Sequence, residues 1–349
     1  MAALPISAPF HTGQMKNSMG KISATRVCAA LCGLLLAAAN GYAGEQQASL
    51  DWLKIVAFAG HQTDYSGIFV YQYGNRVETS RIIHVVETDG EYEKLESLDG
   101  PKREIIRHHG QVWCYINHKM VQMDTKHQQM RTRFADLPPE QLSVLNANYR
   151  AQEVGIERVA GYNTQAILLQ PIDSLRYAHK IWVHTDSGLL LKASVLGDKN
   201  QVVEQYAFTQ LQLGGNLDRS WIVQDASTAN QKAGSVTQQP ENSKGVTHID
   251  SGWVVDALPP GFKKTMEVER LMHGKHRPVT QLVFSDGLSA ISIFIELNDF
   301  DEDDVEGLSS RGAVNLYHKV VGDHLITVVG EVPPRTLMQV FHSVRNNGS

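Results

Sequence analysis

Apolar residues first recur at a regular interval in residues 46–60, and the interval is helical. Leu50, Leu53 and Ala57 fall three or four positions apart on one face, and Ile55, Val56 and Phe58 widen that apolar face. An apolar stripe of this width is typical of a helix that packs on a core, and a glycine such as Gly60 often follows the last turn. The pattern therefore predicts an amphipathic helix over residues 46–60.

Beyond this helix the apolar residues alternate with a period of two, which indicates β-strands. Two aromatic rows result: Phe69, Tyr71 and Tyr73 in an early strand, and Trp113 and Tyr115 in a later one. Turns at Asp89-Gly90 and Asp99-Gly100 separate the runs at hairpin spacing. We expect an antiparallel meander, followed by a helix that begins at Pro138 and Pro139.

The most regular pattern lies in residues 179–213, where three apolar runs are joined by the turns TDSG and GDKN. Leu189, Leu191, Ala193 and Val195 share one face, but the opposite face is also fairly apolar. Strands of this kind need cover on both sides, or one face lines a cavity.

The composition changes over residues 223–248, which contain no Leu, Ile, Met or aromatic residue. Such a segment cannot bury itself, so we expect a flexible linker that lets two domains move relative to each other. Hairpins about Asp286-Gly287 and Gly322-Asp323 follow the linker. A helix starting at Pro333-Pro334 then carries an i, i+3, i+4, i+7 apolar stripe, Leu337, Val340, Phe341 and Val344. The predicted domains are residues 44–222 and 249–346.

The first 43 residues look like an export signal rather than part of the fold. They carry Lys16, Lys21 and Arg26, no acidic residue, and an apolar run over residues 27–39 that is too short to span a bilayer. We expect cleavage after Ala43 and export to the periplasm, with Met15 as an alternative start.

Charge and cysteine content narrow the range of possible functions. The formal net charge is −5, and removing the signal makes the chain more acidic still, which argues against nucleic-acid binding. Cleavage leaves Cys114 as the one cysteine, so no intrachain disulfide forms and the fold depends on its core. A buried free thiol is the expected state of Cys114.

The sequence contains no catalytic motif: no nucleophile elbow, phosphate loop, dinucleotide fingerprint or zinc-protease motif. The adjacent His108 and His109 point to opposite faces of a strand. The acidic run at residues 298–307 lacks the glycine and glutamate of a calcium loop. We therefore expect no catalytic residue, no metal site and no cofactor.

One basic group is a candidate anion site. Lys102, Arg103 and Arg107 cluster in an otherwise acidic chain, and such clusters receive phosphate or carboxylate groups. The alternative is ordinary surface charge paired with neighbouring glutamates such as Glu104.

Taken together, several segments resemble the RseB/MucB family of periplasmic regulators of the envelope-stress sigma factor. They include YSGIFVYQY, ESLDGPKREIIR, VWCYIN and the meander from residue 180. In the second domain they include GWVVDALPPGF, FSDGLSAISIFIE, SSRGAVNLY and GDHLITVVGEVPPRTLMQV. The order is that of the family, and the resemblance covers nearly all of the chain after the signal.

This resemblance implies a fold class of α+β, mainly antiparallel β. The first domain would be an unclosed β-barrel with helices, similar to the lipoprotein carriers LolA and LolB, and the second a smaller α+β domain. It implies binding to the periplasmic domain of an RseA/MucA-type anti-sigma factor and protection of that domain from cleavage by a DegS-type protease. Lipopolysaccharide or another acylated lipid would relieve the inhibition.

A half-barrel offers a concave apolar face for such a ligand. The candidate ligand-binding residues are Phe69, Tyr71, Trp113 and Tyr115 in its lining and Lys102, Arg103 and Arg107 at its rim. For any one of the aromatic residues a plain core role is equally compatible.

Other functions stay open at this stage. The main alternative is a periplasmic lipid or lipoprotein carrier of the LolA type, although such carriers lack the second domain. A hydrolase with an unrecognised site and a scaffold without a soluble ligand are further alternatives. Self-association into homo-oligomers also stays open.

Overall fold

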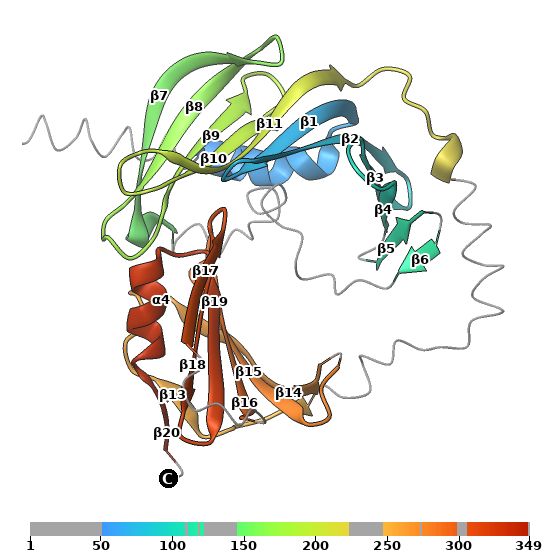
Figure 1. The fold of residues 1–349 in the computed structure, drawn as a ribbon. Coiled ribbons are helices and arrows are strands. Elements are labelled where there is room, and N and C mark those ends of the chain that lie inside the picture. The colour runs from blue at the N-terminus through green and yellow to red at the C-terminus, as the bar shows by residue number, and fades with distance from the viewer. Residues whose placement is uncertain are drawn as a thin grey trace, which may run out of the picture. The chain divides into compact units, whose positions relative to one another are not determined.

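The computed structural model describes residues 51–108, 111–117, 119–121, 145–222, 247–272, 274–298 and 306–347. The predicted signal, most of the linker and most of the helix expected at Pro138 lie outside these residues. Within them the chain forms two large antiparallel sheets (Figure 1). No helix among the described residues is long and apolar enough to cross a membrane.

The first sheet has eleven strands and two unpaired ends, so it is not closed into a barrel. In sheet order the strands are β6 (Lys119–Val121), β5 (Gln111–Ile116), β4 (Arg103–His108), β3 (Gly90–Ser97), β2 (Arg76–Glu87), β1 (Tyr65–Tyr73), β11 (Val202–Leu213), β10 (Leu190–Leu196), β9 (Ala178–His184), β8 (Tyr162–Pro171) and β7 (Tyr149–Val159). Sequence neighbours pair as hairpins, and the long-range pairing of β1 with β11 joins the two meanders. The predicted meanders are therefore parts of one sheet.

A helix over residues 51–62 packs on one face of this sheet. Leu53 and Val56 are almost fully buried against Ile167, Ile181 and Val183 of β8 and β9. The predicted helix is thus present, and it runs two residues beyond Gly60, while residues 46–50 lie outside the described part.

The second sheet has seven strands, and one α-helix packs on it (Figure 1). In sheet order the strands are β12 (Thr247–His248), β14 (Lys263–Leu271), β15 (Pro278–Ser285), β16 (Ala290–Leu297), β19 (His324–Gly330), β18 (Val314–Val321) and β17 (Glu306–Arg311). A separate two-stranded sheet pairs β13 (Trp253–Val255) with β20 (Val344–Asn346). Thr247 and His248, expected in the linker, pair with β14 as β12.

Helix α4 (Pro334–Phe341) begins where the sequence predicts, with Pro333 at its N-cap. Leu337, Val340 and Phe341 are buried against the second sheet. Both predicted hairpins form, β15–β16 about Asp286-Gly287 and β18–β19 about Gly322-Asp323. The expected fold class is confirmed: α+β and mainly antiparallel, with an unclosed first sheet and a smaller second domain.

Candidate functional site

A cleft of about 600 Å³ lies beside the helix over residues 51–62. Apolar side chains of the helix line it together with Lys54, Gln62 and Ser187. Two of these, Ile55 and Phe58, are 43% and 64% exposed, although their types favour burial. An apolar wall with a few polar groups suits an amphipathic ligand. The sequence predicted the helix but gave no indication that part of its apolar stripe stays open.

The first predicted aromatic row lies within the core rather than along this cleft. Phe69 is 6% exposed and packs edge-to-face on Tyr206, with ring centres 4.9 Å apart. Tyr71 is half-buried and tilts against Tyr73 at 5.1 Å. Because β1 pairs with β11, Phe69 stands opposite Phe208. This geometry gives Phe69 a packing role in the sheet.

The second predicted row belongs to a different apolar cluster. Trp113 and Tyr115 are half-buried and pack near Ile106, Leu217 and Trp221. Phe69 and Tyr71 belong instead to the cluster around Tyr206 and Phe208. The structure therefore does not bring the two rows into one lining.

Each of the three predicted basic residues lies within 4 Å of a glutamate carboxylate. Lys102 Nζ lies 3.7 Å from Glu104, Arg103 lies 3.9 Å from Glu78, and Arg107 lies 3.4 Å from Glu93. The last pair follows from register, since Glu93 and Arg107 stand directly opposite each other in β3 and β4. Surface charges that are already paired are weaker anion receptors than free ones.

A second charged group surrounds Trp182 in β9. Glu157 accepts hydrogen bonds from Lys180 Nζ and from the indole N–H of Trp182, both at 2.7 Å. The ammonium groups of Lys180 and Lys192 lie 4.7 and 4.3 Å from the centre of the indole ring. The hydrogen bond from Lys180 is the main cause that lowers the pKa of Glu157, and burial lowers the pKa of Lys192. The group connects side chains of β7, β9 and β10.

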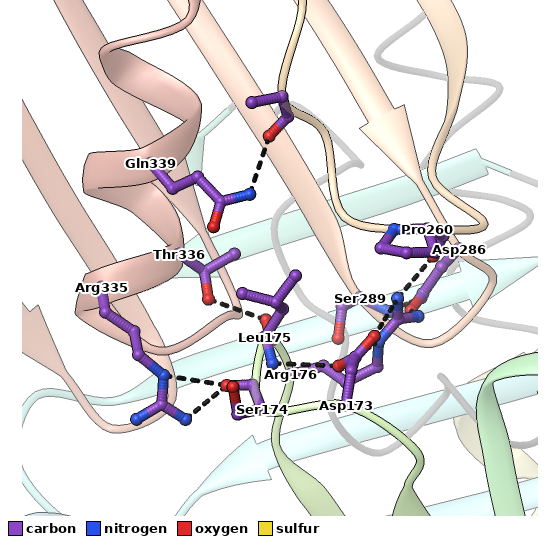
Figure 2. A network of polar contacts seen from close by, with 11 residues as sticks. Asp173, Ser174, Leu175, Arg176, Pro260, Asp286, Ser289, Arg335, Thr336 and Gln339 are labelled. Atoms are coloured by element: carbon purple, nitrogen blue, oxygen red, sulfur yellow. Dashed lines mark hydrogen bonds and ion pairs between the residues drawn. The ribbon is translucent and has the colours of Figure 1, made fainter.

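The loop between β8 and β9 makes contacts with the second domain that sequence reasoning did not find. Arg176 is fully buried and donates to Asp286 Oδ2 at 2.6 Å, where Asp286 is also fully buried (Figure 2). Asp173 accepts from the same guanidinium at 3.1 and 3.2 Å. The guanidinium also donates to the carbonyl of Pro260. One buried cation thus joins two carboxylates and two domains.

Helix α4 holds the same loop from another side. Arg335 Nε donates to the carbonyl of Ser174 at 2.9 Å, and Thr336 Oγ1 donates to the carbonyl of Leu175 at 2.9 Å (Figure 2). The guanidinium of Arg335 also pairs with both oxygens of Asp198 in the β10–β11 turn. The hydrogen bond from Arg335 lowers the pKa of Asp198.

A third contact is the tip of the β17–β18 hairpin, residues 311–313. The buried amide of Ala313 donates to Glu204 Oε2 at 2.9 Å, and Ala313 itself is 1% exposed against Tyr177 and Val195. Arg311 donates to the hydroxyl of Tyr73 at 2.7 Å and stacks over its ring. Behind the tip, Asn315 Nδ2 donates to Tyr177 OH at 2.9 Å. The hairpin tip is therefore inserted into the first domain.

The fold and these contacts define a class of protein. It is a two-domain α+β protein in which an unclosed antiparallel sheet with an amphipathic cleft is joined to a smaller sheet domain by buried polar contacts. Among the described residues no group of three or more His, Cys, Asp or Glu side chains is placed to hold a metal ion.

Comparison with known families identifies the family to which the chain belongs. The MucB/RseB N-terminal domain model matches residues 48–226, and the MucB/RseB C-terminal domain model matches residues 247–345. The chain therefore belongs to the MucB/RseB family, as its motifs indicate. The sigma factor AlgU regulatory protein MucB of Pseudomonas aeruginosa is 32% identical over 84% of this chain and 90% of its own length. The sigma-E factor regulatory protein RseB of Escherichia coli is 23% identical over 90% and 95%.

Solved structures agree with this assignment. The structure of the Pseudomonas aeruginosa MucA/MucB complex covers 86% of this chain and 99% of its own, at 30% identity and a TM-score of 0.68. A second structure, MucB with the periplasmic part of MucA, has a TM-score of 0.66 at the same identity and coverage. A structure of MucB by itself has a TM-score of 0.56 at 29% identity and 85% coverage.

Proposed function

We propose that this protein is a periplasmic regulator that binds the periplasmic domain of a MucA/RseA-type anti-sigma factor. In this role it shields the anti-sigma factor from site-1 cleavage by a DegS-type protease. Lipopolysaccharide, or another acylated lipid, binds the regulator and relieves the inhibition. The chain reaches the periplasm after cleavage near Ala43.

The observation that carries the proposal is the match of both domains, in order, to the MucB/RseB models. Two solved MucB structures with MucA also superimpose on the chain over 86% of its length. The relatives at 23 to 32% identity are named as regulatory proteins of sigma factors. These names describe regulators and give no support to a catalytic role.

The first experiment mixes residues 44–349 with the periplasmic domain of the anti-sigma factor from the same genome. Calorimetry measures binding with and without lipopolysaccharide, and a DegS-type protease tests protection in parallel. Saturable binding, slower cleavage and loss of both on adding lipopolysaccharide support the whole proposal. Absence of binding refutes it.

The lipid site within this proposal has two candidate locations. The predicted one uses Lys102, Arg103 and Arg107 with the aromatic rows, and the other is the cleft beside Phe58. Replacing the three basic residues by Glu tests the first, and Phe58→Asp tests the second. Since the basic residues are already paired with glutamates, we expect the larger loss of lipid binding from Phe58→Asp.

The same cleft favours a second function, that of a lipid or lipoprotein carrier of the LolA type. A carrier would bind acylated lipid and show no affinity for the anti-sigma domain. The calorimetric experiment therefore separates the two functions directly.

A further inference from the structure

The contact between the two domains buries charge that each domain alone would leave in water. Arg176 and Asp286 are both fully buried where they meet. Asp286 also accepts the amide hydrogens of Leu288 at 3.0 Å and Ser289 at 2.8 Å, so its side chain is fixed in the β15–β16 turn. A buried ion pair is specific in geometry but adds little net stability, because desolvation offsets the Coulomb attraction. Such a contact holds one arrangement without making it permanent.

Leu288 adds apolar packing to this polar contact. It comes from the second domain but is 3% exposed within the core cluster of the first, beside Leu145 and Tyr149. The guanidinium of Arg176 lies 5.8 Å from the ring of Tyr149 and 5.5 Å from the ring of Phe262. The contact therefore combines a buried ion pair with specific apolar packing.

The hairpin tip adds a steric requirement. Gly312 has a φ of +62°, a conformation that L side chains rarely adopt. A Cβ at this position would stand 2.7 Å from Glu204 Oε2 and 2.9 Å from Tyr73 Cβ, both in the first domain. A side chain at Gly312 cannot be accommodated unless the tip moves away from Tyr73 and Glu204.

We propose that loop 172–177 and the hairpin tip 311–313 form a domain latch, and that the latched arrangement is the one that binds the anti-sigma segment. This inference rests on the proposed function. The chain superimposes better on the two MucA-bound MucB structures than on MucB by itself, although identity and coverage are nearly equal. Any ligand that prefers the unlatched form then releases the partner in proportion to that preference.

Population arithmetic gives the size of the effect. The apparent dissociation constant equals the intrinsic one divided by the latched fraction. A change that lowers the latched fraction from near one to about a tenth weakens binding about ten-fold. A substitution that strains the hairpin without touching the first domain has no such effect.

The chain offers a matched pair of variants for the test. Gly312→Leu and Gly322→Leu both place a side chain at a left-handed turn position, with φ of +62° and +57°. At Gly322 nothing lies within 4 Å of the new Cβ, whereas at Gly312 it meets the first domain. The strain in the turn is therefore matched, and only the domain contact differs.

Fluorescence energy transfer between dyes at Asn163→Cys and His276→Cys reports the domain arrangement. Both positions are exposed, one in each domain, and the native Cys114 is fully buried. Calorimetry with the anti-sigma periplasmic domain reports binding for the same samples. We expect Gly312→Leu to change the transfer efficiency and weaken binding at least about ten-fold, and Gly322→Leu to change neither beyond about two-fold.

The outcomes separate the latch from the proposed function. If the wild type binds and Gly312→Leu changes the transfer but not the affinity, the latch proposal is wrong and the function stands. If Gly312→Leu changes neither, the hairpin does not hold the domains and the proposal is also wrong. If the wild type itself fails to bind, the proposed function is refuted and the latch proposal with it.

A charge exchange covers the case in which Gly312→Leu fails to fold. Arg335 and Asp198 are 45% and 58% exposed, so substitutions there leave both cores intact. Asp198→Lys replaces an attraction by a repulsion at Arg335, which also donates to Ser174 of the latch loop, and should weaken binding by about two- to five-fold. Adding Arg335→Glu should restore much of the transfer efficiency and the affinity, and if Asp198→Lys changes the transfer efficiency without weakening binding, the latch proposal is wrong.

Discussion

Replacing Arg176 by Met should destabilise the protein more than any substitution of a surface charge. Arg176 is fully buried and is the cation that compensates Asp286, which is equally buried, and Asp173. Met fills a similar volume but leaves the carboxylate of Asp286 without a counterion. Removing one partner of a buried pair costs about 3–5 kcal/mol.

The pH dependence has a definite sign. Burial raises the pKa of Asp286 above its usual value, and Arg176 counteracts part of that rise. Without Arg176 the pKa rises further, and a carboxyl with a raised pKa favours the folded state only where it is protonated. The loss in Arg176→Met should therefore be largest at neutral pH and shrink as the pH falls toward 4.

The assay is urea unfolding at pH 7 and pH 5, followed by tryptophan fluorescence and by circular dichroism. Two probes are needed because a two-domain chain need not unfold in one step. Arg81→Met is the control, since Arg81 pairs with Glu96 at 2.9 Å but is 49% exposed. Exposed pairs contribute about 0–1 kcal/mol.

Asp286→Asn supplies the second arm of the test. The amide keeps an acceptor for the turn amides of Leu288 and Ser289, and Arg176 keeps Asp173. We expect a loss of about 1–3 kcal/mol, smaller than that of Arg176→Met. If Arg176→Met costs no more than Arg81→Met, the buried pair does not stabilise the folded protein and the reasoning is refuted.

Three further predictions follow from single sites. Glu157→Gln should cost less than about 1 kcal/mol at neutral pH, because the side chain is 43% exposed; since the folded-state pKa of Glu157 is lowered, chiefly by Lys180, the difference from wild type in urea unfolding should shrink as the pH falls below the usual glutamate pKa and vanish only below the lowered one. Cys114 is fully buried and burial raises its pKa, so a thiol reagent at pH 8 should label it only after unfolding, and rapid labelling of the native protein would contradict this. Leu288→Ala should cost about 2–4 kcal/mol in thermal or urea unfolding, and a loss below 1 kcal/mol would show that its pocket in the first domain is not packed.

The contacts between the domains differ from what the composition of the linker predicts. A segment without large apolar residues predicts that the domains move freely. Residues 223–246 lie outside the described part, but on either side of them Arg176, Arg335 and Ala313 contact the opposite domain. A flexible linker determines which domain arrangements are sterically accessible. The buried contacts between the domains determine which of these arrangements is populated.

Local pattern alone determined the elements of this protein. Alternation gave strands such as β1, β10, β16 and β19 but not the β7–β8 hairpin, and Asp-Gly turns placed the hairpins at residues 89–90 and 286–287. The apolar stripe Leu337, Val340 and Phe341 gave α4 with its start at Pro334, but the fourth predicted member, Val344, lies beyond the helix and begins β20. These features depend on backbone conformation and on residues within one or two turns, so they are readable from neighbours in sequence. The ordered motifs also sufficed to indicate the family.

Tertiary structure alone decided which side chains are free. Phe69 is buried because β1 pairs with β11, which places Phe208 opposite it across the sheet. Arg107 is paired because the register of β3 and β4 places Glu93 opposite it, and Arg103 reaches Glu78 of β2, which is 25 residues earlier in the sequence. Arg176 and Asp286 are 110 residues apart in sequence, and neither position differs from an ordinary surface charge in its local pattern. Long-range pairing costs loop entropy that only the complete core offsets, so no short window of sequence contains it.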